Sequence, residues 1–477
     1  MRSFSDTDRQ ILSTFSPGFG GPVVPEWIKP WLENGLGSVT LFASNTPNFE
    51  TAEHLITELR SYNPDVLIAI DEEGGDVTRL FVREGSRYPT PALLGKCDDE
   101  DLTFRSYNSM GSVLKNIGVD ITYAPVADVV AYEDNPIVGV RSFGMSAELV
   151  NRHVLKAIQG LQSAGVGACV KHFPGHGAVA EDSHHDLPRI KLNLKDYEKN
   201  HIEPFKNAIN AGVSAVMIGH LIVECLDLDF PSSMSQKILN EYLRGFLNFN
   251  GLIVTDALDM GAVGGPSKIH ISALNALSAG ADLLCFSGMG DQSQFVANSF
   301  EWIQEAVKRN DLSLENLTQS ADKVRNWRSR FASGTSNDEI IDFNELIQGF
   351  EITGDVEIES SAINLVEIGT KPTIAAGDVS WGIHRELRSI GIACDIHASD
   401  AENLASKKLV VAFRDAYRDA PLLATLNRLN LRFPDAIFID MGWPTREFTP
   451  KTLIRAYGSS AIVSQAVAAR IRGLAPR

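Results

Sequence analysis

The chain has 477 residues, of which 44% are hydrophobic and 22% are charged, so it is long enough for two or more globular domains, one of which could be a barrel. Its 60 acidic and 43 basic residues give a formal net charge of −17. This charge repels phosphate backbones and anionic lipid surfaces, so we expect neither nucleic acid nor a membrane as a partner.

Short apolar runs alternate with longer amphipathic segments from about residue 37 to residue 288, which is typical of an α/β fold. Parallel sheets bury such nearly continuous apolar runs on both faces. The predicted strands are Ser38–Phe42, Val66–Ile70, Val119–Ala124, Gly167–Val170, Ala215–Ile218, Leu252–Thr255 and Asp282–Phe286.

Helices are predicted between these strands. Apolar residues recur at helical spacing over Ala147–Ser163, with Ser146 placed to act as the N-cap and Gly165 beyond the end. Ser235 is expected to cap a second helix, which stops before Gly251 and leads into the next strand.

Polar residues lie just after several of the predicted strands, namely Asp71, Lys171 with His172, His220 and Asp256. In a (β/α)8 barrel the carboxyl ends of the strands form the active-site face, so these residues would converge there. A doubly wound sheet also places its ligand at the carboxyl ends of strands. We prefer the barrel of the two.

A polar, unpatterned segment from Phe331 to Glu339 ends this pattern and reads as a linker. Beyond it, Pro372–Ala376, Leu409–Phe413 and Ala436–Ile439 read as strands, and Ser460–Gly473 reads as a helix. The sequence therefore predicts a TIM-like barrel domain over residues 1–335, a linker over 336–350 and a smaller α/β sandwich domain over 351–477.

The five cysteines are scattered, odd in number and without CxxC spacing, so neither a disulfide framework nor a structural zinc site is expected. The first residues lack an apolar h-region, and no later stretch approaches the ~18 apolar residues of a membrane span. We therefore expect a soluble, cytoplasmic protein.

The run Lys171-His172-Phe173-Pro174-Gly175-His176-Gly177, followed after four residues by Asp182-Ser183-His184, is the most informative segment. Its glycines and proline forbid a regular helix, while a cation, imidazoles and a carboxylate crowd together. Such a loop at a strand end indicates an enzyme.

Several motifs in this order resemble glycoside hydrolase family 3, and the Asp-Ser-His element resembles its β-N-acetylglucosaminidase branch. They are Asp71-Glu72-Glu73-Gly74-Gly75, Val140-Arg141-Ser142-Phe143-Gly144, the run from Lys171 to Gly177 with Asp182-Ser183-His184, and Thr255-Asp256-Ala257-Leu258-Asp259-Met260. The resemblance covers roughly residues 10 to 330 and, more weakly, the C-terminal domain. Asp76 departs from it, because such proteins commonly carry Arg after Glu-Gly-Gly.

The resemblance implies a retaining mechanism with Asp256 as nucleophile, His184 as acid/base and Asp182 as the residue that orients His184. Histidine suits this role, since its ordinary pKa of about 6.5 allows it to donate and then accept a proton near neutrality. The plain alternatives are that Asp256 caps a helix and that His184 is a solvated loop residue.

The resemblance also places five residues in the sugar subsite, with no cofactor: Asp71, Arg79, Arg141, Lys171 and His172. A carboxylate accepts hydrogen bonds from sugar hydroxyls, and the cations and the imidazole donate to them. These residues could instead form ion pairs, Asp71 with Arg79 or Lys171 and Arg141 with Asp128. Roles for Glu72, Glu73 and His220 stay open.

Three other functions are weighed against hydrolysis of terminal β-linked N-acetylglucosamine. Phosphate could replace water on the same scaffold, because an imidazole repels a phosphate dianion less than a carboxylate does. A divalent metal held by His172, His176, His184, Asp182 and Asp186 would make a metal-dependent hydrolase, although the Pro-Gly-His-Gly spacing matches no common zinc motif. A non-catalytic sugar-binding module would not need both Asp256 and the Asp182 and His184 pair. The natural leaving group, whether muropeptide, chitin fragment or glycoconjugate, stays open, as does the oligomeric state.

Overall fold

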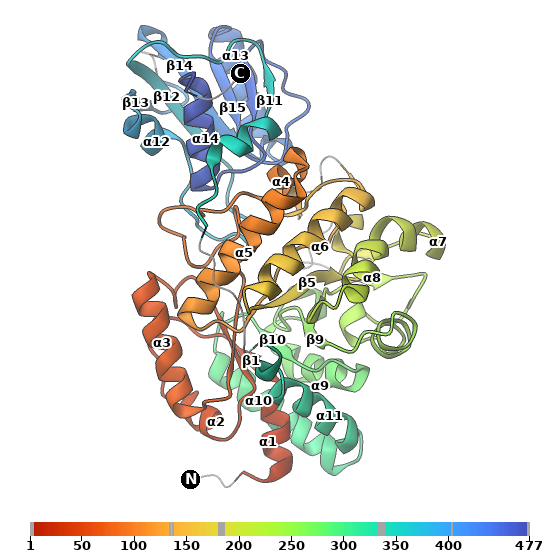
Figure 1. The fold of residues 1–477 in the computed structure, drawn as a ribbon. Coiled ribbons are helices and arrows are strands. Elements are labelled where there is room, and N and C mark those ends of the chain that lie inside the picture. The colour runs from red at the N-terminus through yellow and green to blue at the C-terminus, as the bar shows by residue number, and fades with distance from the viewer. Residues whose placement is uncertain are drawn as a thin grey trace.

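The computed structural model describes residues 4–132, 135, 138–179, 187–331, 339–401 and 404–474. Within these ranges the chain forms a barrel, and a second α/β unit sits over one end of it (Figure 1). No helix of the described part is long and apolar enough to cross a membrane.

Parallel strands form the barrel. Six of them follow the order β2-β3-β4-β5-β7-β9, an isolated bridge joins β9 to the segment that leads into β10, and β10 pairs with β1. A hydrogen bond of 2.9 Å between the Ser16 and Ser38 hydroxyls connects β1 to β2 and so completes the barrel. The strands are β1 (Phe15–Pro17), β2 (Ser38–Leu41), β3 (Leu67–Ile70), β4 (Ile121–Thr122), β5 (Gly167–Phe173), β7 (Ala215–Ile218), β9 (Leu252–Thr255) and β10 (Leu284–Phe286).

Alternate residues of these strands point into the barrel, as the two-residue period of a strand requires. Leu67 and Ala69 of β3, Ala215 and Met217 of β7, and their equivalents on neighbouring strands form one buried cluster that also contains Trp327. The barrel interior is thus a packed core, which leaves the site at its strand ends.

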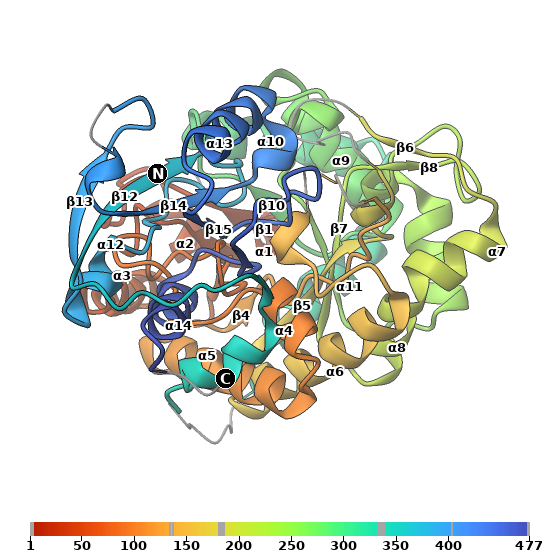
Figure 2. The same cartoon turned by 90° about the horizontal axis from the view of Figure 1, so that it is seen from above.

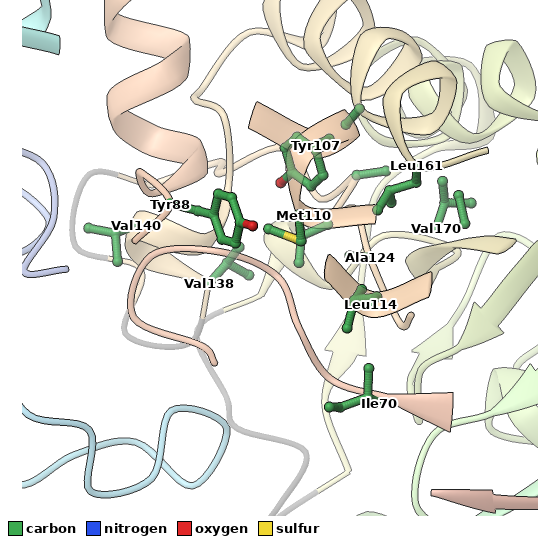
Figure 3. Packing of buried hydrophobic residues seen from close by; sticks show 14 of the residues in the cluster. Ile70, Tyr88, Tyr107, Met110, Leu114, Ala124, Val138, Val140, Leu161 and Val170 are labelled. Atoms are coloured by element: carbon green, nitrogen blue, oxygen red, sulfur yellow. The ribbon is translucent and has the colours of Figure 1, made fainter. Parts of the chain in front are cut away.

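Helices surround the barrel and bury the outward-facing strand residues. In Figure 3, Met110 and Leu114 of α5 and Leu161 of α6 lie near Ile70 and Val170 of the strands, within the large outer core. The helices are α1 (Asp6–Ser13), α2 (Lys29–Glu33), α3 (Phe49–Tyr62), α4 (Pro91–Cys97), α5 (Glu100–Ile117), α6 (Ala147–Ser163), α7 (Leu194–Tyr197), α8 (Glu203–Asn210), η5 (Lys237–Phe246), α9 (Ile269–Ala279), α10 (Gln292–Lys308) and α11 (Leu314–Arg325).

Side chains predicted to start helices do so. The Ser146 hydroxyl accepts a hydrogen bond from the Leu149 N–H at the start of α6, and the Ser235 hydroxyl accepts one from the Ile238 N–H at 3.1 Å. Caps of this type are typically worth about 1 kcal/mol each. The strands at Ala215–Ile218 and Leu252–Thr255 also have the predicted bounds.

The C-terminal unit is a six-stranded sheet in the order β11-β16-β15-β14-β12-β13, with only β11 antiparallel to its neighbour. Seen from above, this sheet and its helices lie in front of the barrel (Figure 2). Its elements are η9 (Phe343–Gly349), β11 (Glu351–Thr353), β12 (Ala362–Gly369), α12 (His384–Ser389), β13 (Ala393–His397), β14 (Lys408–Arg414), α13 (Ala420–Arg432), β15 (Ile437–Asp440), β16 (Leu453–Arg455) and α14 (Ala461–Ile471).

One predicted strand is wrong. Residues Pro372–Ala376 form no strand but belong to a loop that crosses toward the barrel, and the strand lies earlier, in β12. The domain boundaries at residues 335 and 350 stay predictions. Residues 336–338 of the predicted linker lie outside the described residues, and the rest of it contains the 3₁₀ helix η9, which packs against α4 and α14.

Asp76, the departure from the family motif, contacts the C-terminal unit. Its Oδ1 accepts hydrogen bonds from the Ser459 N–H at 3.1 Å and from the Ser459 hydroxyl at 3.0 Å. The Arg414 guanidinium donates to the same hydroxyl at 3.2 Å. Asp76 therefore connects the loop after β3, which also carries Arg79, to the C-terminal unit by hydrogen bonds.

Candidate active site

A cavity of about 380 Å³ opens at the carboxyl ends of the barrel strands. Six of the eight predicted site residues line it: Asp71, Arg79, Arg141, Lys171, His172 and Asp256. They come from β5 and from the segments that follow β3, β4 and β9, so the topology brings together residues that are distant in sequence. Asp182 and His184 lie outside the described residues, as do His185 and Asp186.

Lys171, buried at the end region of β5, binds two carboxylates. Its Nζ lies 2.7 Å from Asp71 Oδ1 and 2.6 Å from Glu73 Oε1. Burial lowers the pKa of Lys171, but the two carboxylates outweigh it and hold this pKa above its ordinary value. Lys171 is therefore a cation of the pocket wall that pairs with Asp71 and Glu73.

Arg141 binds Glu73 rather than Asp128, the partner considered from the sequence. Arg141 Nε lies 2.8 Å from Oε2, and Nη2 lies 2.7 Å from Oε1. Burial raises the pKa of Glu73, but Arg141 and Lys171 together hold it well below its usual range. Glu73 is thus a charged residue of the pocket wall whose role the sequence left open.

Asp128 fixes the histidine of the site. Its Oδ2 lies 2.7 Å from His172 Nδ1, and its Oδ1 accepts a hydrogen bond from the His176 N–H at 2.6 Å. The other ring nitrogen of His172 lies 3.4 Å from Arg141 Nη2. A carboxylate on one imidazole nitrogen sets the orientation of the ring, so His172 presents its Nε2 edge to the pocket side.

The glycines of the Lys171–Gly177 run permit this crowding. Gly175 has a φ of 124°, in the region that favours glycine. A Cβ at Gly177 would lie 2.1 Å from the Val129 carbonyl oxygen, so only glycine fits there. The neighbouring His176 is buried, which lowers its pKa to about 4 and keeps its ring neutral near pH 7.

Asp256 follows β9 directly and does not cap a helix. The next helical segment in the described part begins at Gly261. The Ala257 N–H donates to Asp256 Oδ1 at 2.8 Å, and the carbonyl of Ala257 lies 3.0 Å from Nε2 of buried His220. His220 therefore supports the backbone beside Asp256, which assigns it a scaffold role.

Glu72 also belongs to the scaffold. Its Oε2 accepts hydrogen bonds from the Thr78 hydroxyl at 3.0 Å and from the backbone N–H groups of Arg79 and Leu80. Burial raises the pKa of Glu72 to about 7. This carboxyl shapes the loop that carries Arg79.

The C-terminal unit completes the pocket wall, with residues that the sequence did not single out. Residues Ile374, Ala375, Ala376, Gly377 and Asp378 line the cavity. Arg79 Nη2 donates to the Ala375 carbonyl at 2.9 Å while lying 3.6 Å from Asp71 Oδ2. Ile374-Ala375-Ala376 reads as an apolar strand, and only the following Gly377-Asp378 signals a turn.

Among the residues that the structure describes, no group of three or more His, Cys, Asp or Glu side chains is arranged to hold a metal ion. What the pocket does contain is carboxylates and cations at close range beside Asp256. Such groups can donate hydrogen bonds to hydroxyls and accept hydrogen bonds from them, so the pocket suits a polar, hydroxyl-bearing ligand.

Comparison with known proteins agrees with this description. Residues 23–327 match the family model described as "Glycosyl hydrolase family 3 N terminal domain". A protein of Nitrosomonas eutropha named beta-hexosaminidase is 34% identical over 280 residues, which cover 57% of this chain and 79% of that protein. A beta-hexosaminidase of Chromobacterium violaceum is 35% identical over 256 residues, covering 52% of this chain and 71% of the relative.

A solved structure is similar over nearly the whole chain. It is a glycoside hydrolase family 3 beta-N-acetylglucosaminidase from Paenibacillus sp. str. FPU-7, with a TM-score of 0.90 and 25% identity, covering 99% of this chain and 98% of that one. The fold and the site thus define a two-part barrel glycoside hydrolase. The chain belongs to glycoside hydrolase family 3, as the motifs predicted, and the predicted barrel followed by an α/β sandwich is confirmed.

Proposed function

We propose that this enzyme removes terminal β-linked N-acetylglucosamine from its substrate by double displacement. The observation that carries the proposal is the placement of Asp256 in one cavity with Asp71 and with the buried side chains of Lys171, Glu73 and Arg141, which ion pairs join. The names of the relatives, beta-hexosaminidase and beta-N-acetylglucosaminidase, support the choice of sugar.

In the first step, the Asp256 carboxylate attacks the anomeric carbon while His184 protonates the departing oxygen, which gives a covalent glycosyl-enzyme. In the second step, His184 removes a proton from water, and the water oxygen replaces Asp256. Asp182 is proposed to hold the His184 ring and to stabilise its cationic form.

The remaining pocket residues hold the sugar. Asp71 accepts hydrogen bonds from hydroxyls with the carboxylate lone pairs that Lys171 does not use, and Arg79, Arg141 and Lys171 donate to the sugar oxygens with protons that their carboxylate partners do not use. His172 adds its Nε2 edge. Because these groups are already paired and buried, they need little rearrangement when the substrate binds.

The stereochemistry of the first product tests this mechanism. Two successive inversions restore the β configuration, so proton NMR of fresh product from an aryl N-acetyl-β-glucosaminide should show the β anomer before mutarotation. An initial α anomer would remove Asp256 from the nucleophile role.

Activity after removal of metal ions separates this mechanism from a metal-dependent one. We expect full activity after prolonged EDTA treatment and dialysis, because no proposed step uses an ion. Loss of activity that zinc or manganese restores would replace the double displacement by metal-activated water.

A cytoplasmic location stays part of the proposal. It is supported by the five cysteines, none of which forms a disulfide: Cys97, Cys169, Cys225, Cys285 and Cys394 are free thiols.

A further inference from the structure

The mouth of the pocket is built from both parts of the chain. Met289, from the loop after β10, and Ile374, from the C-terminal unit, line the cavity with 61% and 47% of their surfaces exposed. The strand-end residues Lys171 and Glu73, by contrast, are buried. The cavity therefore has an outer end, at the exposed Met289 and Ile374, and an inner end with the buried side chains that are proposed to bind N-acetylglucosamine.

The loop with Ile374 is held in place by both parts. The Arg79 guanidinium donates to the Ala375 carbonyl, and the Ser380 N–H donates to the Val82 carbonyl at 2.8 Å. Inside the loop, the Ala376 N–H donates to the Thr373 hydroxyl at 3.2 Å. The loop is thus a fixed wall of the pocket mouth.

Asp378 brings a carboxylate to this wall. It lines the cavity and is exposed, and it forms no hydrogen bond or ion pair with any residue that the structure describes. Asp259, on the barrel side of the same cavity, is held by the Ser287 N–H at 3.0 Å. Two carboxylates therefore face the cavity without a cationic partner in the described part.

The cations of the pocket do not balance them. Lys171 binds Asp71 and Glu73, Arg141 binds Glu73, and Arg79 lies between Asp71 and the Ala375 carbonyl. Within the described part, the lining carboxylates outnumber the lining lysine and arginine side chains: Asp71, Glu73, Asp256, Asp259 and Asp378 stand against Arg79, Arg141 and Lys171. The formal charge of the lysine, arginine and carboxylate side chains that line the cavity in the described part is therefore negative.

We propose that Asp378 makes the mouth of the pocket selective for neutral or cationic leaving-group sugars and against anionic ones. This inference rests on the proposed function, because it assigns the mouth to the sugar that departs. A negative potential in a partly enclosed site attracts an amine, leaves an uncharged sugar unaffected and repels a carboxylate. Met289 and Ile374 offer apolar contact to the C–H face of that sugar.

The test compares three β-1,4-linked disaccharides that share the N-acetylglucosamine to be released and differ in the charge of the reducing sugar. That sugar is glucosamine, N-acetylglucosamine or a sugar with a carboxylate. We expect kcat/KM to fall in this order, with a spread on the order of tenfold or more between the cationic and the anionic substrate at low salt. Asp378→Asn should narrow the spread of kcat/KM between the cationic and the anionic disaccharide severalfold.

Asp435→Asn is the matched control. It removes the same charge from an exposed ion pair with Lys451, at 2.8 Å, on the C-terminal unit and outside the pocket, so the spread should stay as in the unchanged enzyme. A preference for the anionic disaccharide, or an Asp378→Asn variant with an unchanged spread, would overturn the inference. Hydrolysis of an aryl N-acetyl-β-glucosaminide, measured in parallel, reports on the proposed function independently, because an aryl group carries none of these charges.

Discussion

Arg141 donates two hydrogen bonds to the Glu73 carboxylate, from Nε at 2.8 Å and from Nη2 at 2.7 Å, and both side chains are buried. Removing one partner of such a pair leaves a buried charge uncompensated and costs about 3–5 kcal/mol. Here the same carboxylate also neutralises Lys171.

Glu73→Gln should therefore lower both stability and activity. We expect the free energy of unfolding to fall by a few kcal/mol, and kcat/KM on an aryl N-acetyl-β-glucosaminide to fall on the order of tenfold or more, since Lys171 and Arg141 lose their anchor. Urea unfolding and steady-state kinetics measure the two effects. Activity within about twofold of the unchanged enzyme would show that Glu73 does not position the pocket cations.

Asp256→Ala should abolish most turnover while the protein stays folded, with a loss of kcat on the order of 10³-fold or more. Asp71→Ala should lose less in kcat, because it removes a sugar contact and not the attacking group. Added azide offers a sharper readout. A small anion can occupy the space of the missing carboxylate and attack the anomeric carbon once, so the glycosyl azide should have the α configuration. A β azide, or equal kcat losses for the two variants, would contradict the assignment.

His184→Ala should show an effect that depends on the leaving group. A poor leaving group needs protonation and should lose on the order of 10²–10⁴-fold in the first step, whereas an acidic phenol should lose little. Asp182→Asn should give a milder form of the same profile, through the tautomer and charge of the ring. A Brønsted plot over a series of aryl substrates measures this. Equal losses along the series would remove His184 from the acid/base role.

Much of the barrel and of the site was predictable because both follow from local patterns. Continuous apolar runs mark the buried strands, and polar residues at their ends mark the face where Asp71, Lys171 and Asp256 meet. The pairing of Glu73 with Arg141 was not predictable, because it depends on the paths of two loops that are 68 residues apart.

The second unit was harder to predict for a physical reason. Strand β12, Ala362–Gly369, carries Asn364 and Glu367 and so lacks a continuous apolar run. The loop at Pro372–Ala376 has the apolar residues of a strand but is held by Arg79 and by its own turn contacts. Tertiary contacts outweigh β propensity there.

The stability of the protein should depend on pH through Glu72, whose pKa rises from 4.5 to about 7 because it is buried. Between these values the folded state binds more protons at Glu72 than the unfolded state does, so its contribution is present in full below pH 4.5 and is lost as pH rises toward 7. The total change is on the order of 3 kcal/mol. Glu72→Gln carries no titrating proton and should lack this contribution.

The difference in unfolding free energy between the unchanged enzyme and the Glu72→Gln variant reports the contribution of Glu72 alone. His176 and His201, whose pKa values burial lowers to about 4, make stability rise with pH over part of the same range, but they do so in both proteins. Urea unfolding at several pH values between 4.5 and 7 should show the unfolding free energy of the unchanged enzyme falling relative to that of Glu72→Gln. A constant difference would mean that Glu72 is ionised throughout in the folded state.

The acidic residues of the C-terminal unit should leave the pH dependence of kcat in place, because His184 makes both proposed proton transfers and precedes that unit in the chain, as do Asp182 and Asp256. Asp440 is the strictest test of this expectation among these acidic residues. It is buried, accepts a hydrogen bond from the Thr445 N–H at 2.8 Å and has a pKa raised to about 7 by burial.

Asp440 thus titrates in the range where an acid/base would, yet it does not line the cavity. Asp378→Asn, Asp415→Asn and Asp440→Asn should each keep the pH–rate profile of kcat on an aryl substrate, even where Asp440→Asn alters the pH dependence of stability. If one of these folded variants lost turnover and small external anions restored it, the acid/base would belong to the C-terminal unit, and His184 would have to give up that role.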